Sequence, residues 1–184
     1  KTDPKCDTLS ADHDNWMLMI DTLFNIIWNT NIGGNDSESS PHPVLLNDGN
    51  LMFSTSSKSD SSCEKSQNQW GLSNNEDYWI CVIDSNGNKL WDKTLGGLGV
   101  DDAPRIIQLS TGDFIVAGTS TSTIGGDKTV ANYGFPLSRD FWAIKLDGVG
   151  NQLWDRVYGG DGSESSIGGN TFSLLPTENG SFIL

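Results

Sequence analysis

Acidic residues recur at equal intervals along this chain, and carboxylates held in a regular array could bind cations. Glu38, Asp101 and Glu164 follow one another at intervals of 63 residues, and each comes shortly after a pair of glycines. Carboxylate oxygens are preferred ligands of Ca²⁺. Two interpretations stay open: the acids line a rim that holds cations, or they cap backbone amides of an adjacent structural unit. Ca²⁺ is the only cofactor that the sequence suggests.

A second cation signature lies in the segment DSNGN, residues 84–88, which places Asp, Asn and Asn at alternate positions as in part of a calcium-binding loop. The two other copies of this segment replace the middle residue Asn86 with Leu23 and Val149, whose side chains carry no oxygen. Only the outer Asp and Asn recur. We therefore predict a tight turn in which Asp84 accepts hydrogen bonds from backbone amides.

Candidate catalytic groups are few. The two histidines, His13 and His42, fall in predicted loops, and the sequence has no Ser-His-Asp spacing, phosphate-binding loop or His/Cys metal cluster. Cys81 is replaced by aliphatic residues in the other copies, which indicates a core position. Cys6 and Cys63 fall in predicted connectors, and a bridge between them stays open. We predict no catalytic residue; a non-enzymatic role is favoured, and an enzymatic one is left open.

The elements that position these residues follow from a repeat of 63 residues. The segment DYWICVIDSNGNKLWDKTLGG begins at Asp77, and its close copy DFWAIKLDGVGNQLWDRVYGG begins at Asp140. A third, more divergent copy begins near Asn15. The residues that keep the interval in all three copies are Trp16, Trp79 and Trp142; Trp28, Trp91 and Trp154; and the pairs Gly33 and Gly34, Gly96 and Gly97, and Gly159 and Gly160. Such residues are expected to build the repeat, with the tryptophans buried between its units.

Each copy is predicted to form β-strands joined by tight turns. In the second copy the expected strands cover residues 78–84, 89–95, 104–109 and 113–120. The Asn-Gly pair between the first two favours a hairpin, because both residues tolerate a positive φ. A long polar connector, residues 121–139, follows the fourth strand. We expect the four strands of one copy to form one antiparallel sheet, with the extra length of the repeat lying between sheets.

Serially repeated four-stranded sheets are typical of the blades of a β-propeller. The sequence therefore predicts an all-β fold with blades at residues 15–76 and 77–139, a truncated blade at 140–184, and the end of a preceding connector or blade at 1–14. A β-sandwich or a β-solenoid is the alternative fold. Propellers have about 4–8 blades. Three copies thus predict an incomplete ring, which further blades of a longer chain or a partner chain would complete.

Aromatic residues outside the repeat register are candidates for ligand binding. Trp70 lies in the polar connector CEKSQNQWGLSNNE, and Tyr133 and Phe135 lie in the segment ANYGFPLS of the next connector. An aromatic ring exposed on a loop is a common recognition element. The alternative is that these rings fold back onto the sheets.

The charge of the chain narrows the choice of partners. Lys and Arg number 11 against 24 Asp and Glu, which gives a formal net charge of −13. Such a surface repels phosphate backbones and anionic lipids, and no apolar run approaches the roughly 20 residues that span a bilayer. We therefore expect neither nucleic acid binding nor membrane insertion, and we favour a protein or glycan partner at a cell surface.

The order of these motifs resembles a known group of proteins. DYWICVIDSNGNKLWDKTLGG, followed by GDFIVAGTSTS and GGDKT, is similar to the repeats of long secreted β-propeller proteins of bacteria that use the type IX secretion system. DSNGNKLW also resembles the tryptophan-docking motif of quinoprotein propellers. The first likeness implies a propeller, export to the cell surface or medium, and a C-terminal sorting domain in the full-length protein. It implies no reaction.

From these features we predict a secreted or cell-surface β-propeller segment that acts as a non-catalytic binding, adhesion or cargo scaffold. One alternative is part of a secreted carbohydrate-active enzyme, which would need a cluster of carboxyls of raised pKa in a central funnel. The other is a calcium-dependent lectin, which would hold metal beside Asp101 and its equivalents.

Overall fold

Every regular element that the structure describes is a β-strand. The computed structural model describes residues 13–72, 74–135, 137–164, 173–177 and 180–184, and the expected all-β fold is confirmed within them. The strands are β1 (Asn15–Ile20), β2 (Ile26–Ile32), β3 (Glu38–Leu45), β4 (Leu51–Ser57), β5 (Asp77–Ile83), β6 (Lys89–Leu95), β7 (Asp101–Gln108), β8 (Phe114–Ser120), β9 (Asp140–Leu146), β10 (Gln152–Tyr158), β11 (Leu175–Pro176) and β12 (Phe182–Ile183).

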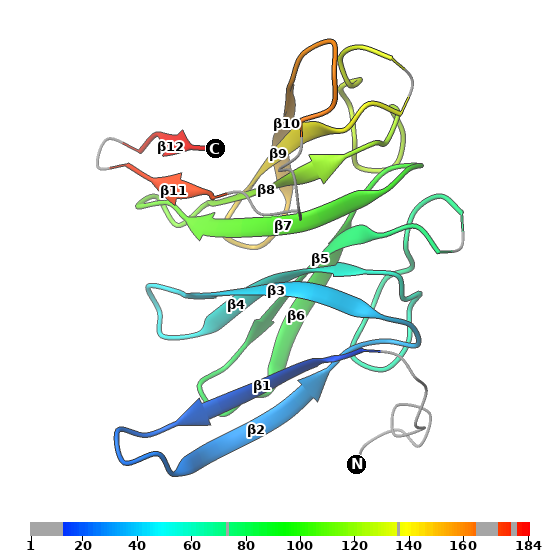
Figure 1. Cartoon of the computed structure of the whole chain (residues 1–184). Coiled ribbons are helices and arrows are strands. Elements are labelled where there is room, and N and C mark those ends of the chain that lie inside the picture. Colours follow the sequence, from blue (N-terminus) through cyan, green and yellow to red (C-terminus); the bar gives the residue numbers. More distant parts are fainter. Residues whose placement is uncertain (1–12, 73, 136, 165–172, 178–179) are drawn as a thin grey trace.

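Two antiparallel sheets of four strands form the centre of the molecule, and a two-stranded hairpin lies at each end of the stack. The strand orders are β3-β4-β5-β6 and β7-β8-β9-β10, and the hairpins are β1-β2 and β11-β12. Figure 1 shows β1-β2 at the bottom, the sheet β3–β6 above it, and the sheet β7–β10 at the top beside β11 and β12. Each sheet is a meander of sequential strands. The predicted four-stranded antiparallel sheets are therefore confirmed, and they are blade-like.

The sheets are offset from the sequence repeats by half a copy. The prediction that the four strands of residues 78–120 form one sheet is wrong, because β5 and β6 share a sheet with β3 and β4, whereas β7 and β8 share one with β9 and β10. The predicted boundaries after residues 76 and 139 therefore fall inside sheets. A repeat fixes the spacing of the strands but not which neighbours share hydrogen bonds, and both groupings have the same period.

The long polar connectors were predicted to lie between sheets, but each of them joins two strands of the same sheet. Residues 58–76 join β4 to β5, and residues 121–139 join β8 to β9, so each connector belongs to a single sheet. The link between the two sheets is the short segment 96–100. A Cβ added to Gly97 would lie 2.6 Å from Cβ of Ser122. Only glycine therefore lets this link pass so close to the neighbouring connector.

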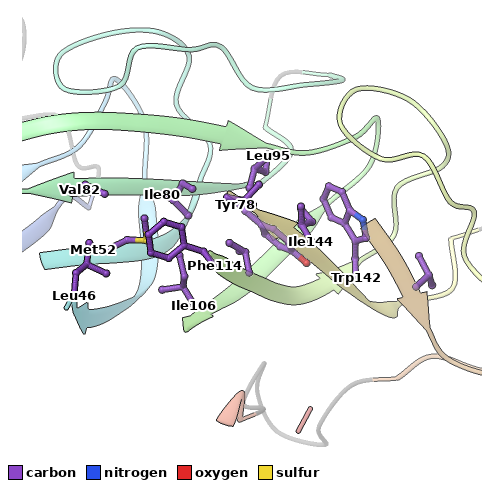
Figure 2. Close-up of a cluster of buried hydrophobic side chains, with 13 residues drawn as sticks. Leu46, Met52, Tyr78, Ile80, Val82, Leu95, Ile106, Phe114, Trp142 and Ile144 are labelled. Atoms are coloured by element: carbon purple, nitrogen blue, oxygen red, sulfur yellow. The ribbon is translucent and has the colours of Figure 1, made fainter. Parts of the chain in front are cut away.

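Apolar side chains fill the space between successive sheets. The cluster between β3–β6 and β7–β10 is drawn in Figure 2, where Tyr78 and Ile80 of β5 gather with Trp142 and Ile144 of β9. The rings of Tyr78 and Trp142 lie 5.3 Å apart between centroids. A second cluster joins the hairpin β1-β2 to the sheet β3–β6, and a third joins the sheet β7–β10 to the hairpin β11-β12.

The first set of repeated tryptophans differs in burial along the chain. Trp79 and Trp142 are fully buried, whereas their counterpart Trp16 is 66% exposed. The difference follows from what packs on each face: Trp79 packs against the hairpin β1-β2 and Trp142 against the sheet β3–β6, whereas Trp16 belongs to none of the three apolar clusters. Burying one indole stabilises a fold by roughly 3 kcal/mol or more. Trp79 and Trp142 are therefore major contributors to the core, and Trp16 is not.

The second set of tryptophans docks onto the turn of the next copy. A Cβ added to Gly87 would lie 3.1 Å from the ring of Trp28, and one added to Gly150 would lie 3.2 Å from the ring of Trp91. Both glycines have a positive φ, +84° and +88°. Trp154, the third member of the set, packs beside the cluster that joins β7–β10 to β11-β12. These rings link successive sheets at their turns.

Candidate functional site

The DSNGN segment forms a closed turn. Oδ1 of Asp84 accepts hydrogen bonds from the backbone nitrogens of Asn86 at 2.9 Å and Asn88 at 2.8 Å, and Oδ2 accepts from Nδ2 of Asn88 at 3.0 Å. These bonds, that from the Asn88 side chain above all, hold the pKa of Asp84 below its usual value. The same bonds are made in the other copies by Asp21 with Leu23 and Asn25, and by Asp147 with Val149 and Asn151. The predicted turn is therefore present three times.

Each of the three repeated acids faces a second carboxylate, which the sequence pattern did not lead us to expect. The pairs are Asp14 with Glu38, Asp77 with Asp101, and Asp140 with Glu164. Oδ1 of Asp140 and Oε2 of Glu164 lie 2.4 and 2.6 Å from the place that a Cβ of Gly159 would take. In the first copy, the two carboxylates lie 2.1 and 2.9 Å from the corresponding place at Gly33. The first glycine of each pair is needed because carboxyl groups occupy the space of its side chain.

The same acids cap the second glycine of each pair. The backbone nitrogen of Gly97 donates to Oδ2 of Asp101 at 2.8 Å, and the Ser122 hydroxyl donates to the same oxygen at 2.8 Å. The corresponding bonds in the other copies run from Gly34 to Glu38 at 3.2 Å and from Gly160 to Glu164 at 3.0 Å. The capping interpretation thus describes all three acids, although the amides lie in the acid's own copy and not in an adjacent unit.

Burial shields the paired carboxyl groups from water. Asp77 and Asp101 are fully buried, and Oδ1 of each has no hydrogen-bond partner in the part of the chain that the structure describes. Burial raises the pKa of Asp77 to about 8 and that of Glu38 to about 7, and it also raises the pKa of Asp101. When two adjacent carboxyl groups are buried, ionisation of both is unfavourable, because the charges repel each other and neither is solvated by water. The pair of Asp77 and Asp101 therefore retains a proton at neutral pH.

Buried lysines stand beside these pairs. Nζ of Lys128 donates to Oγ of Ser120 at 2.7 Å and to Oδ1 of Asn132 at 2.6 Å, and burial lowers its pKa to about 8. Lys65 is its counterpart one period earlier and is also buried. Within the described ranges, no group of three or more His, Cys, Asp or Glu side chains could hold a metal ion. Two carboxyls beside an ammonium group offer little to Ca²⁺, which takes about 6–8 oxygen ligands.

A ligand-sized pocket lies beside Trp70. Its volume is about 470 Å³, within the range of about 300–1,000 Å³ that is usual for small-molecule sites. It is an open pocket that is bordered by the connector 58–76, strand β6 and the connector 121–139. The lining residues are Gln67, Asn68, Gln69, Trp70, Lys93, Thr94 and Asp127. The wall therefore combines one large aromatic ring with amide and charged groups.

Two hydrogen bonds and one packing contact hold Trp70 in the wall of this pocket. Its Nε1 donates to Oδ2 of Asp127 at 2.9 Å, and its backbone nitrogen donates to Oδ2 of Asp77 at 2.5 Å. The ring lies against Gly126, where an added Cβ would be 2.9 Å from the indole. Trp70 nevertheless remains 42% exposed. The ring thus folds back onto the protein and still offers part of its surface to a ligand.

Amide groups supply unused hydrogen-bonding capacity in the pocket. Oε1 of Gln67 accepts from the backbone nitrogen of Thr94 at 2.9 Å, and Oδ1 of Asn68 accepts from the backbone nitrogen of Ser61 at 2.9 Å. The amide nitrogens of Gln67 and Asn68 have no partner among the described residues. Nζ of Lys93 donates to the carbonyl oxygen of Gly150 at 2.8 Å, which holds this cation at the rim.

The polar pocket is specific to the first connector. One period later, the residues at the positions of Gln67, Asn68 and Thr94 are Val130, Ala131 and Val157. Residues that build the scaffold recur at every interval, whereas these polar groups do not. The polar lining is therefore not required to build the repeat.

The two other aromatic candidates do not join this site. Tyr133, the positional counterpart of Trp70, is 52% exposed, and Phe135 is 78% exposed; neither lines the pocket. The backbone nitrogen of Tyr133 donates to Oδ2 of Asp140 at 2.5 Å, as that of Trp70 does to Asp77. The connector backbone therefore repeats, but the surroundings of the aromatic side chain do not.

The residues considered for catalysis lie outside the pocket. Cys81 is free and fully buried, and burial raises the pKa of its thiol. Burial likewise lowers the pKa of His42. The Cys6–Cys63 alternative depends on Cys6, which lies outside the described residues. A thiol that is disfavoured as the thiolate is poorly prepared for nucleophilic chemistry.

No family model matches the chain, and no curated protein is significantly similar to it. Within the described ranges, no helix is long and apolar enough to cross a membrane.

Proposed function

We propose that this chain is a segment of a β-propeller in a secreted or cell-surface protein, and that it serves as a non-catalytic binding, adhesion or cargo scaffold. The stacking of two four-stranded meanders through a shared apolar core supports the propeller arrangement. The recurring contacts of Trp28 and Trp91 with the next turn support a regular step from sheet to sheet. Partners such as further blades or another chain would complete the ring.

Export to the cell surface or medium is part of this proposal. The net charge of −13 suits a soluble exported protein, and the likeness of the repeats to type IX cargo favours that route. The test is to fractionate the source cells and locate the full-length gene product. We expect it in the medium or at the outer surface and missing from both when the export machinery is disabled. Retention inside normal cells would contradict the proposal.

The observation that carries the binding role is the fixed, partly exposed indole of Trp70 in a polar pocket. An aromatic face suits the C–H face of a sugar ring, and the free amide nitrogens of Gln67 and Asn68 suit its hydroxyl oxygens. A pocket of about 470 Å³ fits a few sugar units better than a folded protein element. We infer that the ligand is a glycan.

The experiment measures binding of soluble neutral and acidic oligosaccharides to the purified chain by titration calorimetry. We expect at least one class to bind, and Trp70→Ala to weaken that binding at least tenfold, about 1.4 kcal/mol. Leu72→Ala is the matched control, because Leu72 is exposed in the same connector but does not line the pocket. If no oligosaccharide bound, or if both variants bound like the parent chain, the glycan assignment would be wrong.

A further inference from the structure

The hairpin β1-β2 presents an apolar face and an unpaired strand edge. Trp16, Leu18 and Ile20 share one face of β1, because side chains alternate along a strand, and they are 66%, 41% and 48% exposed. In the part of the chain that the structure describes, β1 pairs only with β2, so its other edge has no strand beside it. A contiguous apolar surface of this kind marks an interaction site.

The internal copies of β1 show what covers such a strand. β5 and β9 occupy the same position one and two periods later, and each is paired with β4 or β8 on the side that is open in β1. Trp79 and Trp142, the counterparts of Trp16, are fully buried there, because the hairpin or sheet that precedes each of these sheets packs on the same face. The occupant that fits the open edge of β1 is therefore a strand of the β4 and β8 type.

The chain carries a strand of that type at its other end. β12 follows Gly180 at the same spacing at which β4 follows Gly49 and β8 follows Gly112. Within the described residues β12 pairs only with β11, so one of its edges is also open. Figure 1 shows β1 and β12 at opposite ends of the stack, so they do not meet within one molecule.

Neither open edge carries the features that prevent strand pairing. The edge strands of the two complete sheets carry such features: Pro41 and Pro43 in β3, Pro104 in β7, Lys89 and Lys93 in β6, and Arg156 in β10. Strand β1, with the sequence NWMLMI, and strand β12 have neither a charge nor a proline. Proteins use proline and charge to block edge pairing, so β1 and β12 are open to it.

We propose that β1 of one molecule pairs with β12 of a second copy, which completes a composite sheet of order β11-β12-β1-β2. This partner rests on the propeller arrangement proposed above, because the composite sheet takes the strand order of the two complete sheets. Among the strands that the structure describes, each copy has one open edge of each kind, so two copies can join at both. The assembly then holds four complete and two composite sheets, six in all, within the range of about 4–8 blades that closes a ring.

The register of this pairing follows from the internal copies. In the sheet β7–β10, Ile115 of β8 pairs with Lys145 of β9. Their counterparts in β12 and β1 are Ile183 and Met19. These two residues, from different molecules, face each other across the composite sheet.

The test uses two variants of the full chain, Met19→Cys and Ile183→Cys, which are purified separately, mixed and oxidised mildly. We expect the mixture to give a disulfide-linked species of about twice 19.9 kDa on a non-reducing gel, and neither variant alone to give it to a comparable extent. Asn29→Cys mixed with Ile183→Cys is the matched control, because Asn29 is exposed on β2, away from the open edge. Cross-linking that is equal in both mixtures, or absent from both, would overturn the pairing.

Light scattering of the parent chain tests the two-copy ring directly. We expect a mass of about twice 19.9 kDa and a return to the monomer mass in Ile20→Lys. Leu45→Lys should leave the mass unchanged, because Leu45 is 74% exposed at the end of β3 and lies off the open edge. A monomeric parent chain overturns the proposal, and an open series of larger oligomers overturns the closed ring. Glycan binding is measured separately, so either proposal can fail alone.

Discussion

Trp28 of β2 donates a hydrogen bond from its indole nitrogen to the carbonyl oxygen of Ser85 at 2.8 Å, 57 residues further along the chain. The same ring covers Gly87 in the turn between β5 and β6. A contact that begins in one repeat and ends in the turn of the next fixes how neighbouring sheets sit on one another. Trp91 covers Gly150 in the same way, so the interface between sheets is built from the repeat itself.

Gly87→Ala should destabilise the chain more than Gly112→Ala. The φ angles are +84° and +89°, so each alanine meets the left-handed cost of roughly 1–2 kcal/mol. Only the Cβ at Gly87 would press on Trp28, at 3.1 Å, whereas nothing lies within 4 Å of the Cβ at Gly112. We expect Gly87→Ala to lose about 1 kcal/mol more in urea unfolding. Equal losses would show that the Trp28 contact is not tight.

Alanine substitutions at Trp142 and Trp16 should differ sharply, although the two residues hold the same place in the repeat. Trp142 is fully buried and Trp16 is 66% exposed. We expect Trp142→Ala to lower the free energy of unfolding by about 3–5 kcal/mol, and Trp16→Ala to lower that of the monomer by less than about 1 kcal/mol. The measurement is chemical unfolding at low protein concentration. A large loss at Trp16 would contradict the exposure of its side chain.

Asp77→Asn should flatten the dependence of stability on pH. Burial raises the pKa of Asp77 to about 8, whereas an unfolded Asp has a pKa of about 3.9. Between these values the folded chain binds more protons than the unfolded chain, so stability is full at low pH and falls as the pH rises toward 8. The slope per proton reaches about 1.4 kcal/mol per pH unit. The side-chain oxygen of an asparagine can still accept the hydrogen bond from the backbone nitrogen of Trp70. Because asparagine does not titrate, this part of the stability is not lost as the pH rises.

The measurement for Asp77→Asn is the free energy of unfolding at several values between about pH 5 and pH 8. The variant should overtake the parent chain toward the alkaline end of this range. Asp84→Asn serves as the control, because the pKa of Asp84 is lowered and its titration falls below this range. A parent curve that is flat, or that rises with pH in parallel with both variants, would contradict the raised pKa.

Asp127→Ala should weaken glycan binding about tenfold by releasing the indole of Trp70. Oδ2 of Asp127 accepts from Nε1 of Trp70 at 2.9 Å and from the backbone nitrogen of Gly96 at 3.3 Å. Asp127→Asn keeps an oxygen at this place and should bind like the parent chain. Calorimetric affinities of the two variants are the readout. If Asp127→Asn were as weak as Asp127→Ala, charge rather than positioning of Trp70 would be the role of Asp127.

The repeat predicts the strands well and their grouping badly, for one physical reason. Residues such as Trp79, Trp91 and Gly87 recur because identical local conformations recur, and the expected hairpin and turn follow from them. Whether β7 pairs onward with β8 and β9 or back to β6 depends on the path of the chain after Gly96, which the period does not contain. The offset of half a copy therefore required the structure.

The candidate site was partly accessible to prediction. The sequence marks Trp70 as a candidate for ligand binding, with folding back onto the sheet as the alternative, because it is an aromatic residue outside the repeat register in a polar connector. Its partner Asp127 lies 57 residues away in another connector, and only the fold brings the two together. The carboxyl pairs were missed although their signal was present, since Asp14, Asp77 and Asp140 keep the same 63-residue interval as the acids that they face.

Because each complete sheet joins the second half of one copy to the first half of the next, a single copy of 63 residues would contain no complete sheet. An in-frame gene duplication or deletion of that length nevertheless adds or removes one whole sheet, wherever its breakpoints fall, and leaves both ends of the stack unchanged. Recombination can therefore alter the size of this architecture in whole units without exposing a new core. The offset between repeat and sheet gives such a gene a route to stacks with different numbers of sheets.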